Sequence, residues 1–242
     1  MPWVDLVKHA MTSTDNSRSA PQPSQTKSVW DFPTRTFHWL LAISLCGSWF
    51  TAEAGFDWTE WHFYFGYFTL GLLVFRLGWG LVGTTSALFR HWPIGLKSLF
   101  QYSKQLFTKH HSDYAGHTPL GSLAIIAMLA VVATQAISGL FISDDILYAG
   151  PYNPVVSNSL AGELAGLHHT NFIVLQVLVG LHLLAVFWYL FWKKQNLVWP
   201  MIVGIKLADS YPLRFFILVF LAIAGIYLLV SLAPPPPVPD YF

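Results

Sequence analysis

The sequence is poor in charge. Only 10% of its 242 residues are Asp, Glu, Lys or Arg, whereas 54% are hydrophobic and 17% are aromatic. A typical soluble domain carries about 25% charged residues. Mean hydropathy is +0.49. A surface exposed to water needs more charged residues than this, and we therefore expect lipid to surround much of the protein. The net charge of +1 gives no indication of a nucleic acid partner, and we expect none.

Cysteine is nearly absent as well. The single Cys46 lies in an apolar run, which excludes an intrachain disulfide. No C-x-x-C-H motif is present, so covalent attachment of a c-type haem is excluded. Residues 1–27 contain no apolar segment of the kind that a signal peptide needs, and they are rich in Ser, Thr, Gln and Pro. We therefore expect residues 1–29 to form a disordered cytoplasmic tail.

Long hydrophobic runs are abundant by contrast. A membrane-spanning helix needs about 20 predominantly apolar residues. Five segments approach or exceed this length, and the first is short enough to need support from interfacial tryptophans. These segments predict an all-α integral membrane protein with five spans, at approximately 36–53, 62–83, 119–142, 166–191 and 213–233.

The charges in the loops predict the orientation. Lys and Arg residues occur in the N-terminal tail and in the loops between spans two and three and between spans four and five. In the other loops and the C-terminal tail, all of the charged residues are acidic. The positive-inside rule therefore predicts that the N-terminus lies in the cytoplasm and the C-terminus on the opposite, periplasmic side.

Two histidines lie fourteen residues apart on the fourth span. His168 and His182 are separated by about 1400° of helical rotation, roughly 40° short of four turns, so both point to nearly the same side. Along the axis they are about 21 Å apart. His169 is about 140° out of phase with His182, and we therefore choose His168 over His169. An ionisable or metal-ligating side chain at such depth suggests a functional site.

Two further histidines match these in depth. His38 lies near the cytoplasmic start of span one, and His62 opens span two on the periplasmic side. In the predicted topology, His38 faces His182 and His62 faces His168. Each pair can give two imidazole nitrogens to one iron, so the sequence suggests two b-type haems stacked across the membrane. The alternative is that each histidine is a hydrogen-bonded structural residue. The remaining histidines are interpreted as solvated: His9, His91, His110, His111 and His117.

Two arginines are candidates for contacts with a haem. Arg76 lies fourteen residues after His62 on the same span, and Arg35 lies near His38. Either can bind a haem propionate through a charge-assisted hydrogen bond, or extend to the membrane interface. Glycines 47, 66 and 180 would let a flat macrocycle approach the helices, although glycine is also common in membrane helices for packing alone.

Two other features of the sequence each allow two structural interpretations. Residues 93–108 predict an amphipathic helix along the cytoplasmic surface, or else a solvated connector. Aromatic residues at the outer ends of spans one and two suggest a quinone site or an interfacial aromatic belt. These residues are Trp49, Phe50, Phe56, Trp58 and Trp61.

Four segments carry a resemblance to a known family. They are WDFPTRTFHWLL, HFYFGYFTLGLLVFRLGWGLVG, GHTPLGSLAIIAMLAVVATQAISGLFISDD and LHHTNFIVLQVLVGLHLLAVFWY. Together they resemble bacterial di-haem cytochrome b561 proteins and the b-type cytochrome subunits of nickel-iron hydrogenases. The resemblance covers residues 30 to about 206. It implies a four-helix bundle with two haems b, ligated by His38, His62, His168 and His182.

The resemblance also implies a function. Proteins of this kind carry electrons between the quinone pool and a redox partner, which is a periplasmic c-type cytochrome or a dehydrogenase or hydrogenase subunit. We accordingly expect a di-haem domain over 30–206, followed by a fifth membrane helix and a Pro-rich periplasmic tail over 207–242. Two alternatives stay open. One is a quinone-coupled superoxide oxidase that acts alone, and the other is a non-haem membrane transporter of metal ions or protons.

Overall fold

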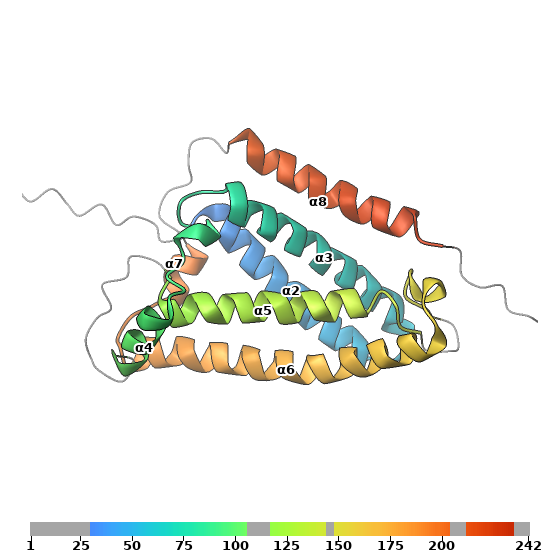
Figure 1. Ribbon diagram of the computed structural model, residues 1–242, viewed down its shortest axis with the longest axis horizontal. Coiled ribbons are helices and arrows are strands. Elements are labelled where there is room, and N and C mark those ends of the chain that lie inside the picture. Colours follow the sequence, from blue (N-terminus) through green and yellow to red (C-terminus); the bar gives the residue numbers. More distant parts are fainter. Residues whose placement is uncertain (1–29, 106–116, 144–147, 204–211, 235–242) are drawn as a thin grey trace, which may run out of the picture.

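The described part of the chain is helical (Figure 1). The computed structural model describes residues 30–105, 117–143, 148–203 and 212–234, so the whole predicted tail 1–29 and most of the Pro-rich end lie outside it. Within the described residues there is one isolated β-bridge, Ser143 to Ala149, and no strand. The α-helices there are α2 (Phe32–Glu53), α3 (Thr59–Val82), α4 (Leu96–Gln105), α5 (Pro119–Ser138), α6 (Asn158–Phe191), α7 (Val198–Ile202) and α8 (Leu213–Ser231).

Each of the five predicted spans coincides with a long helix. Four of these helices, α3, α5, α6 and α8, are long and apolar enough to cross a membrane. The helix α2 is 22 residues long but is not among those four. The chain is therefore an all-α, multi-pass membrane protein, and a crossing by α2 stays a prediction.

Local capping explains where the helices begin. The carboxylate of Asp31 accepts a hydrogen bond from the Thr34 amide at the start of α2, and the Ser157 hydroxyl accepts one from Leu160 at the start of α6. The Ser157 cap makes α6 begin eight residues before the predicted position 166. The helix α5 stops at Ser138 rather than 142, and the chain leaves it through a tighter turn, in which the amides of Leu140 and Phe141 donate to the carbonyls three residues before them.

The helices α2 and α3 form an antiparallel pair. Gly55, with φ +93°, makes the turn between them in the left-handed region that glycine adopts without strain. Deep in the pair, the Ser44 hydroxyl lies 2.8 Å from the Thr69 hydroxyl and donates to the Phe65 carbonyl at 3.0 Å. Such interhelical hydrogen bonds supplement van der Waals packing where lipid surrounds the helices.

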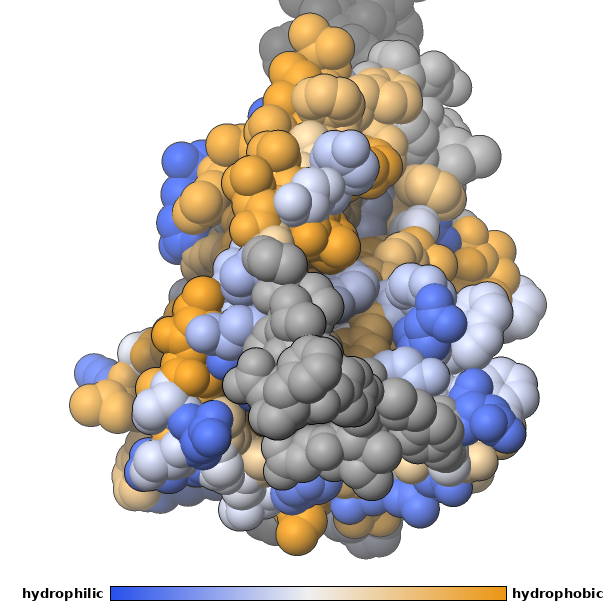
Figure 2. Space-filling view, turned by 90° about the vertical axis from the view of Figure 1, so that its right-hand side faces the viewer, coloured by the Kyte–Doolittle hydropathy of each residue, from blue (hydrophilic) through white to orange (hydrophobic). Residues whose placement is uncertain are grey.

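The last helix packs against α3 on the side away from α6 (Figure 1). Ala222 of α8 is buried in a cluster with Phe75 and Trp79 of α3. Gly78 lies against Leu218, where an added Cβ would come within 2.5 Å of the leucine side chain. Figure 2 views one end of the bundle, where hydrophobic residues dominate the upper part, in which α8 lies, and hydrophilic residues gather below.

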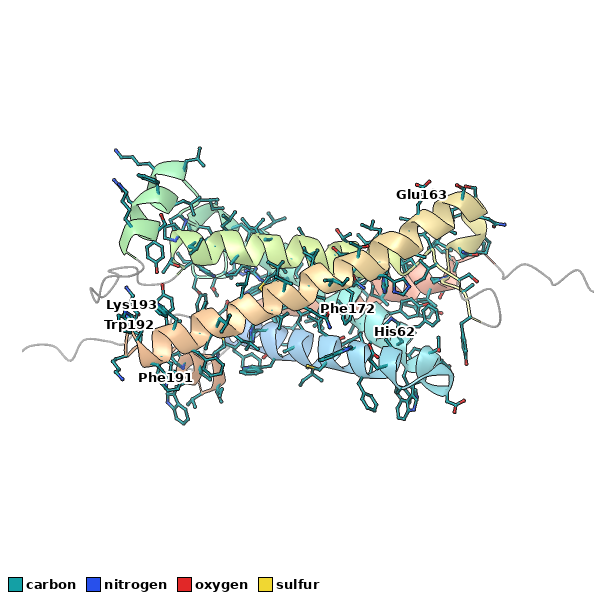
Figure 3. The ribbon with its side chains drawn as sticks, turned by 90° about the horizontal axis from the view of Figure 1, so that it is seen from below. His62, Glu163, Phe172, Phe191, Trp192 and Lys193 are labelled. Carbon is teal, nitrogen blue, oxygen red and sulfur yellow. The ribbon has the colours of Figure 1, made fainter. Side chains whose placement is uncertain are left out.

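Two ends of the bundle can now be defined. The His38 end is where α2 begins and α6 finishes, and the His62 end is where α3 and α6 begin. Figure 3 shows Glu163 and Lys193 at opposite ends of α6. The short helix α4 lies at the His38 end, and it confirms the helix predicted within 93–108 (Figure 1). The Tyr102 hydroxyl of α4 is hydrogen bonded to that of Tyr189 on α6.

Candidate functional site

Four histidines come together as two pairs at opposite ends of the bundle. The ring centre of His38 on α2 lies 6.2 Å from that of His182 on α6, with the ring planes inclined by 53°. The ring centre of His62 on α3 lies 6.3 Å from that of His168 on α6, with the planes inclined by 71°. In Figure 3, His62 lies toward the Glu163 end of α6. The helix α6 thus contributes one histidine to each pair.

These separations suit two imidazoles that share one metal ion. Imidazole nitrogens bind first-row metals such as zinc at about 2.0–2.1 Å, and a five-membered ring with bonds of about 1.33 Å has its atoms about 1.1 Å from its centre. Two imidazoles on opposite sides of one ion therefore have ring centres about 6.3 Å apart. No group of three or more His, Cys, Asp or Glu side chains that could hold a metal ion occurs within the described residues. Two histidines leave the other coordination positions of such an ion open, and a macrocycle can fill them.

At the His62 end, the second ring nitrogen of each histidine has a partner. Nδ1 of His62 lies 2.9 Å from the carbonyl oxygen of Ser48, and Nδ1 of His168 lies 3.2 Å from the hydroxyl oxygen of Ser138. A carbonyl can only accept, so Nδ1 of His62 must carry the proton. This tautomer leaves Nε2 free for a metal, and histidine ligands are usually oriented in this way.

The His38 end is less tightly organised. Nδ1 of His38 is buried and has no hydrogen-bond partner in the described structure, and the ring packs against Trp39 at 5.1 Å. The His182 side chain is exposed at a position well inside an apolar helix. An exposed imidazole facing lipid would be costly, so this position is suited to a group that covers the ring.

The spacing of the helices leaves room for a flat group. Extensive backbone contact joins α6 to α5, but neither α2 nor α3 makes such contact with α6. At Gly66 and Gly180 an added Cβ would meet no atom within 4 Å, whereas at Gly47 it would meet the ring of Phe65 at 2.5 Å. Beside His62, a pocket of about 310 Å³ is lined by Thr51, Ala52, Gly55 and Thr59. The residues present therefore fit a haem at each pair, although Gly47 serves packing on Phe65.

His169 occupies a different position from His168. Its side chain is exposed, and its ring lies edge-on to that of His168, 6.1 Å away. Only the ring of His168 is found opposite His62.

Both candidate arginines are buried at the His38 end. Arg76 is only 2% exposed, and its guanidinium lies over the rings of Phe89 and Trp92 at 4.7 and 5.6 Å. One of its nitrogens donates to the Ala87 carbonyl at 3.4 Å. Arg35 is 8% exposed and donates to the Ile202 carbonyl at 3.2 Å. In this structure both guanidinium groups lie under protein, and Arg76 is held by aromatic rings.

Sequence reasoning missed a polar network near Arg76. The Asp31 carboxylate accepts hydrogen bonds from Trp79 Nε1 at 2.8 Å and from the Thr84 hydroxyl at 2.5 Å, in addition to its capping bond. The Asp-Phe-Pro order at 31–33 is a helix-start signal that could have indicated the capping part of this role. Nothing in the sequence pointed to Trp79 or Thr84, because they lie on other segments.

The interpretation of His117 as solvated is wrong. Its ring centre lies 4.4 Å from that of Trp30 and 4.8 Å from that of Trp92. Burial, together with the nearby charge of Arg76, lowers the pKa of His117 to about 4. By contrast, His91 is exposed, and His9, His110 and His111 lie outside the described residues.

A polar contact between α5 and α6 was also missed. Asn171 Nδ2 donates to Gln135 Oε1 at 2.7 Å and to the Val131 carbonyl at 2.9 Å. Asn171 follows His168 by one helical turn, so this contact fixes α6 against α5 near the second histidine pair.

Among the described aromatic side chains at the outer ends of α2 and α3, the ring contacts fall in separate pairs. Trp49 packs toward Phe172 of α6, with ring centres 6.5 Å apart, and Trp61 packs edge-on to Tyr64 at 5.8 Å. Phe50 packs edge-on to Trp58 at 5.6 Å. Such dispersed and exposed aromatic residues suit the interfacial belt, while the quinone site remains a prediction.

Comparison with known proteins gives one family. A family model described as prokaryotic cytochrome b561 matches residues 29–204, which is more than half of the chain. No curated protein and no solved structure gave a significant match. The match includes all four paired histidines and ends before α8 begins.

Proposed function

The chain belongs to the prokaryotic cytochrome b561 family and is a membrane b-type cytochrome of electron transport; on this premise we propose that it holds two haems b and carries electrons across the membrane. The observation that carries the proposal is the pair of ring separations, 6.2 Å for His38 and His182 and 6.3 Å for His62 and His168. Each pair would supply two imidazole ligands to one haem.

Bis-histidine ligation determines the kind of chemistry. When bound, a haem with two axial imidazoles accepts and donates single electrons without an open iron position for a substrate. The protein's part is to hold the imidazoles, to exclude water and to keep the two sites at opposite ends of α6. His168 and His182 are about 21 Å apart along that helix, so the two sites together cover most of the hydrocarbon thickness.

The distribution of charge supports the orientation that we propose. Basic residues lie at the His38 end and acidic residues at the His62 end: Lys97, Lys104, Lys193 and Lys194 at the first, and Glu53, Glu60 and Glu163 at the second. By the positive-inside rule, the His38 end faces the cytoplasm and the His62 end the periplasm of the bacterial inner membrane. In this orientation α2 crosses beside α3, and α8 returns the chain to the periplasmic side as a fifth span.

We further propose that the electrons pass between the quinone pool and a separate redox protein. In this arrangement residues 30–206 form the di-haem domain and 207–242 an added helix and tail. The partner would be a periplasmic c-type cytochrome, or a dehydrogenase or hydrogenase subunit. Arg76 and Arg35 are basic groups at the His38 end that can pair with haem propionates there.

Transfer across a lipid bilayer tests this function. The purified chain is placed in liposomes that contain trapped ferric cytochrome c, and dithionite is added outside. We expect reduction of the trapped protein, and a rate at the level of protein-free liposomes for the H182A variant, which lacks one axial ligand. Equal rates for the wild type and for protein-free liposomes would contradict the proposal. Rapid superoxide turnover by the chain alone would favour a self-contained oxidase instead.

A further inference from the structure

A serine on α5 fixes the orientation of one of the paired histidines. The Ser138 hydroxyl lies 3.2 Å from Nδ1 of His168 and donates to the Gln135 carbonyl at 3.1 Å. A serine hydroxyl has one proton, and here that proton is directed to the carbonyl. With the proton directed there, Ser138 accepts its second hydrogen bond from Nδ1 of His168, and this tautomer presents a free lone pair on Nε2.

The next residue provides the space for that ring. A Cβ added at Gly139 would lie 3.2 Å from Cε1 and 3.5 Å from Nδ1 of His168. The shorter of these separations is tighter than ordinary van der Waals contact, so the imidazole would have to shift by a few tenths of an ångström to admit a side chain here. Since α5 ends at Ser138, with Gly139 as its C-cap, these two residues form the surface against which the His168 ring packs, which we call the His168 seat.

A buried amide contact holds α6 against this seat. Asn171 is 8% exposed, and its Nδ2 binds both the side chain of Gln135 and the backbone of Val131. Gln135 thus contacts Ser138 through its carbonyl and Asn171 through its side chain. Interhelical hydrogen bonds of this kind fix the register of helices in a membrane.

We propose that Ser138 and Gly139 of α5, a helix without any proposed haem ligand, position His168 and set the reduction potential of the haem at the His62 end. The inference rests on the proposed function. A hydrogen bond accepted from Nδ1–H makes an imidazole a more basic ligand. A more basic ligand favours ferric over ferrous iron and therefore lowers the potential.

The effect is confined to one end of the bundle. At the other end, Nδ1 of His38 is buried and has no hydrogen-bond partner in the described structure. Ser122, near the opposite end of α5, is fully buried, and its hydroxyl also has no partner there. The S122A variant therefore removes the same atom from the same helix without touching His168, which makes it a matched control for S138A.

The test is a potentiometric titration of the full-length haem-loaded protein in detergent. Removal of one outer hydrogen bond typically weakens metal binding by about 10–100-fold. For S138A we expect the ferric preference of one haem to fall about tenfold, which raises its midpoint potential by about 59 mV. The potential of the second haem stays unchanged, S122A leaves both unchanged, and S138T, which keeps the hydroxyl, restores the wild-type value.

The outcomes separate this inference from the proposed function. If the wild type binds two haems and S138A shifts neither potential, or shifts both equally, the positioning role is wrong and the function stands. If the wild type binds no haem, the proposed function itself fails. A second variant, G139A, should reduce haem content to about one per chain or shift the same single potential. Full occupancy with unchanged potentials in G139A would overturn the proposed seat.

Discussion

The imidazole rings of His38 and His182 lie 6.2 Å apart, although their helices, α2 and α6, are not in extensive backbone contact. The same combination holds for His62 and His168 on α3 and α6. A planar cofactor bound between two histidines requires that their helices stand apart while the two imidazoles face each other.

The pairing predicts which substitutions share a phenotype. His62→Ala and His168→Ala should remove the same haem, and His38→Ala and His182→Ala should remove the other one, because each haem needs both of its axial ligands. His169→Ala is the control and should keep both, since the ring found opposite His62 is that of His168. Redox titration of each variant identifies the haem that remains. Loss of different haems within one pair would contradict the pairing.

Arg76 should be sensitive even to a conservative substitution. Its planar guanidinium lies over Phe89 and Trp92, and a lysine cannot stack in the same way. We expect Arg76→Lys to lose about 1–2 kcal/mol of stability, which a lower melting temperature in detergent would report. Arg90→Lys is the matched control, because Arg90 is exposed on the neighbouring segment. An equal effect of the two variants would show that stacking does not matter.

His117 should make stability depend on pH. Its pKa is lowered to about 4 by burial and by Arg76, compared with the ordinary value of 6.5. The folded protein therefore holds this side chain neutral. As the pH falls below 6.5, the unfolded chain binds a proton that the folded chain does not, so stability decreases until about pH 4.

The measurement for His117 is the melting temperature at pH 7.5 and at pH 5. The His117→Gln variant should lose less stability over this interval than the wild type. His91→Gln, at an exposed position, should follow the wild type. If His117→Gln keeps the full pH dependence of the wild type, then groups other than His117 cause that dependence.

The contact between α8 and α3 should be separable from haem binding. At Gly78 a Cβ would meet Leu218 at 2.5 Å, whereas at Gly225 it would meet nothing within 4 Å. Gly78→Leu should therefore destabilise the packing of α8 by about 1–3 kcal/mol, while Gly225→Leu should not. Haem content should be unchanged in both, because the family match ends at residue 204. Loss of haem in Gly78→Leu would show that α8 supports the di-haem domain.

The sequence predicted what depends on helical periodicity and hydropathy. The approximate positions of all five long helices follow from apolar runs, and the position of each histidine along its helix follows from the rise per residue. Contacts between segments could not be predicted in this way. The position of His117 between Trp30 and Trp92 depends on how a loop folds back, and the Asn171–Gln135 contact depends on the register of two helices. Periodicity contains no information about either arrangement.

The most direct test of the central claim is the haem content of the detergent-purified chain. A pyridine haemochrome assay, combined with a dithionite-reduced minus oxidised spectrum, counts the haems and reports their ligation. The account predicts two haems b per chain with the sharp α-band of low-spin, bis-histidine haem. One haem, or a spectrum of five-coordinate haem, would contradict the assignment of two axial histidine pairs.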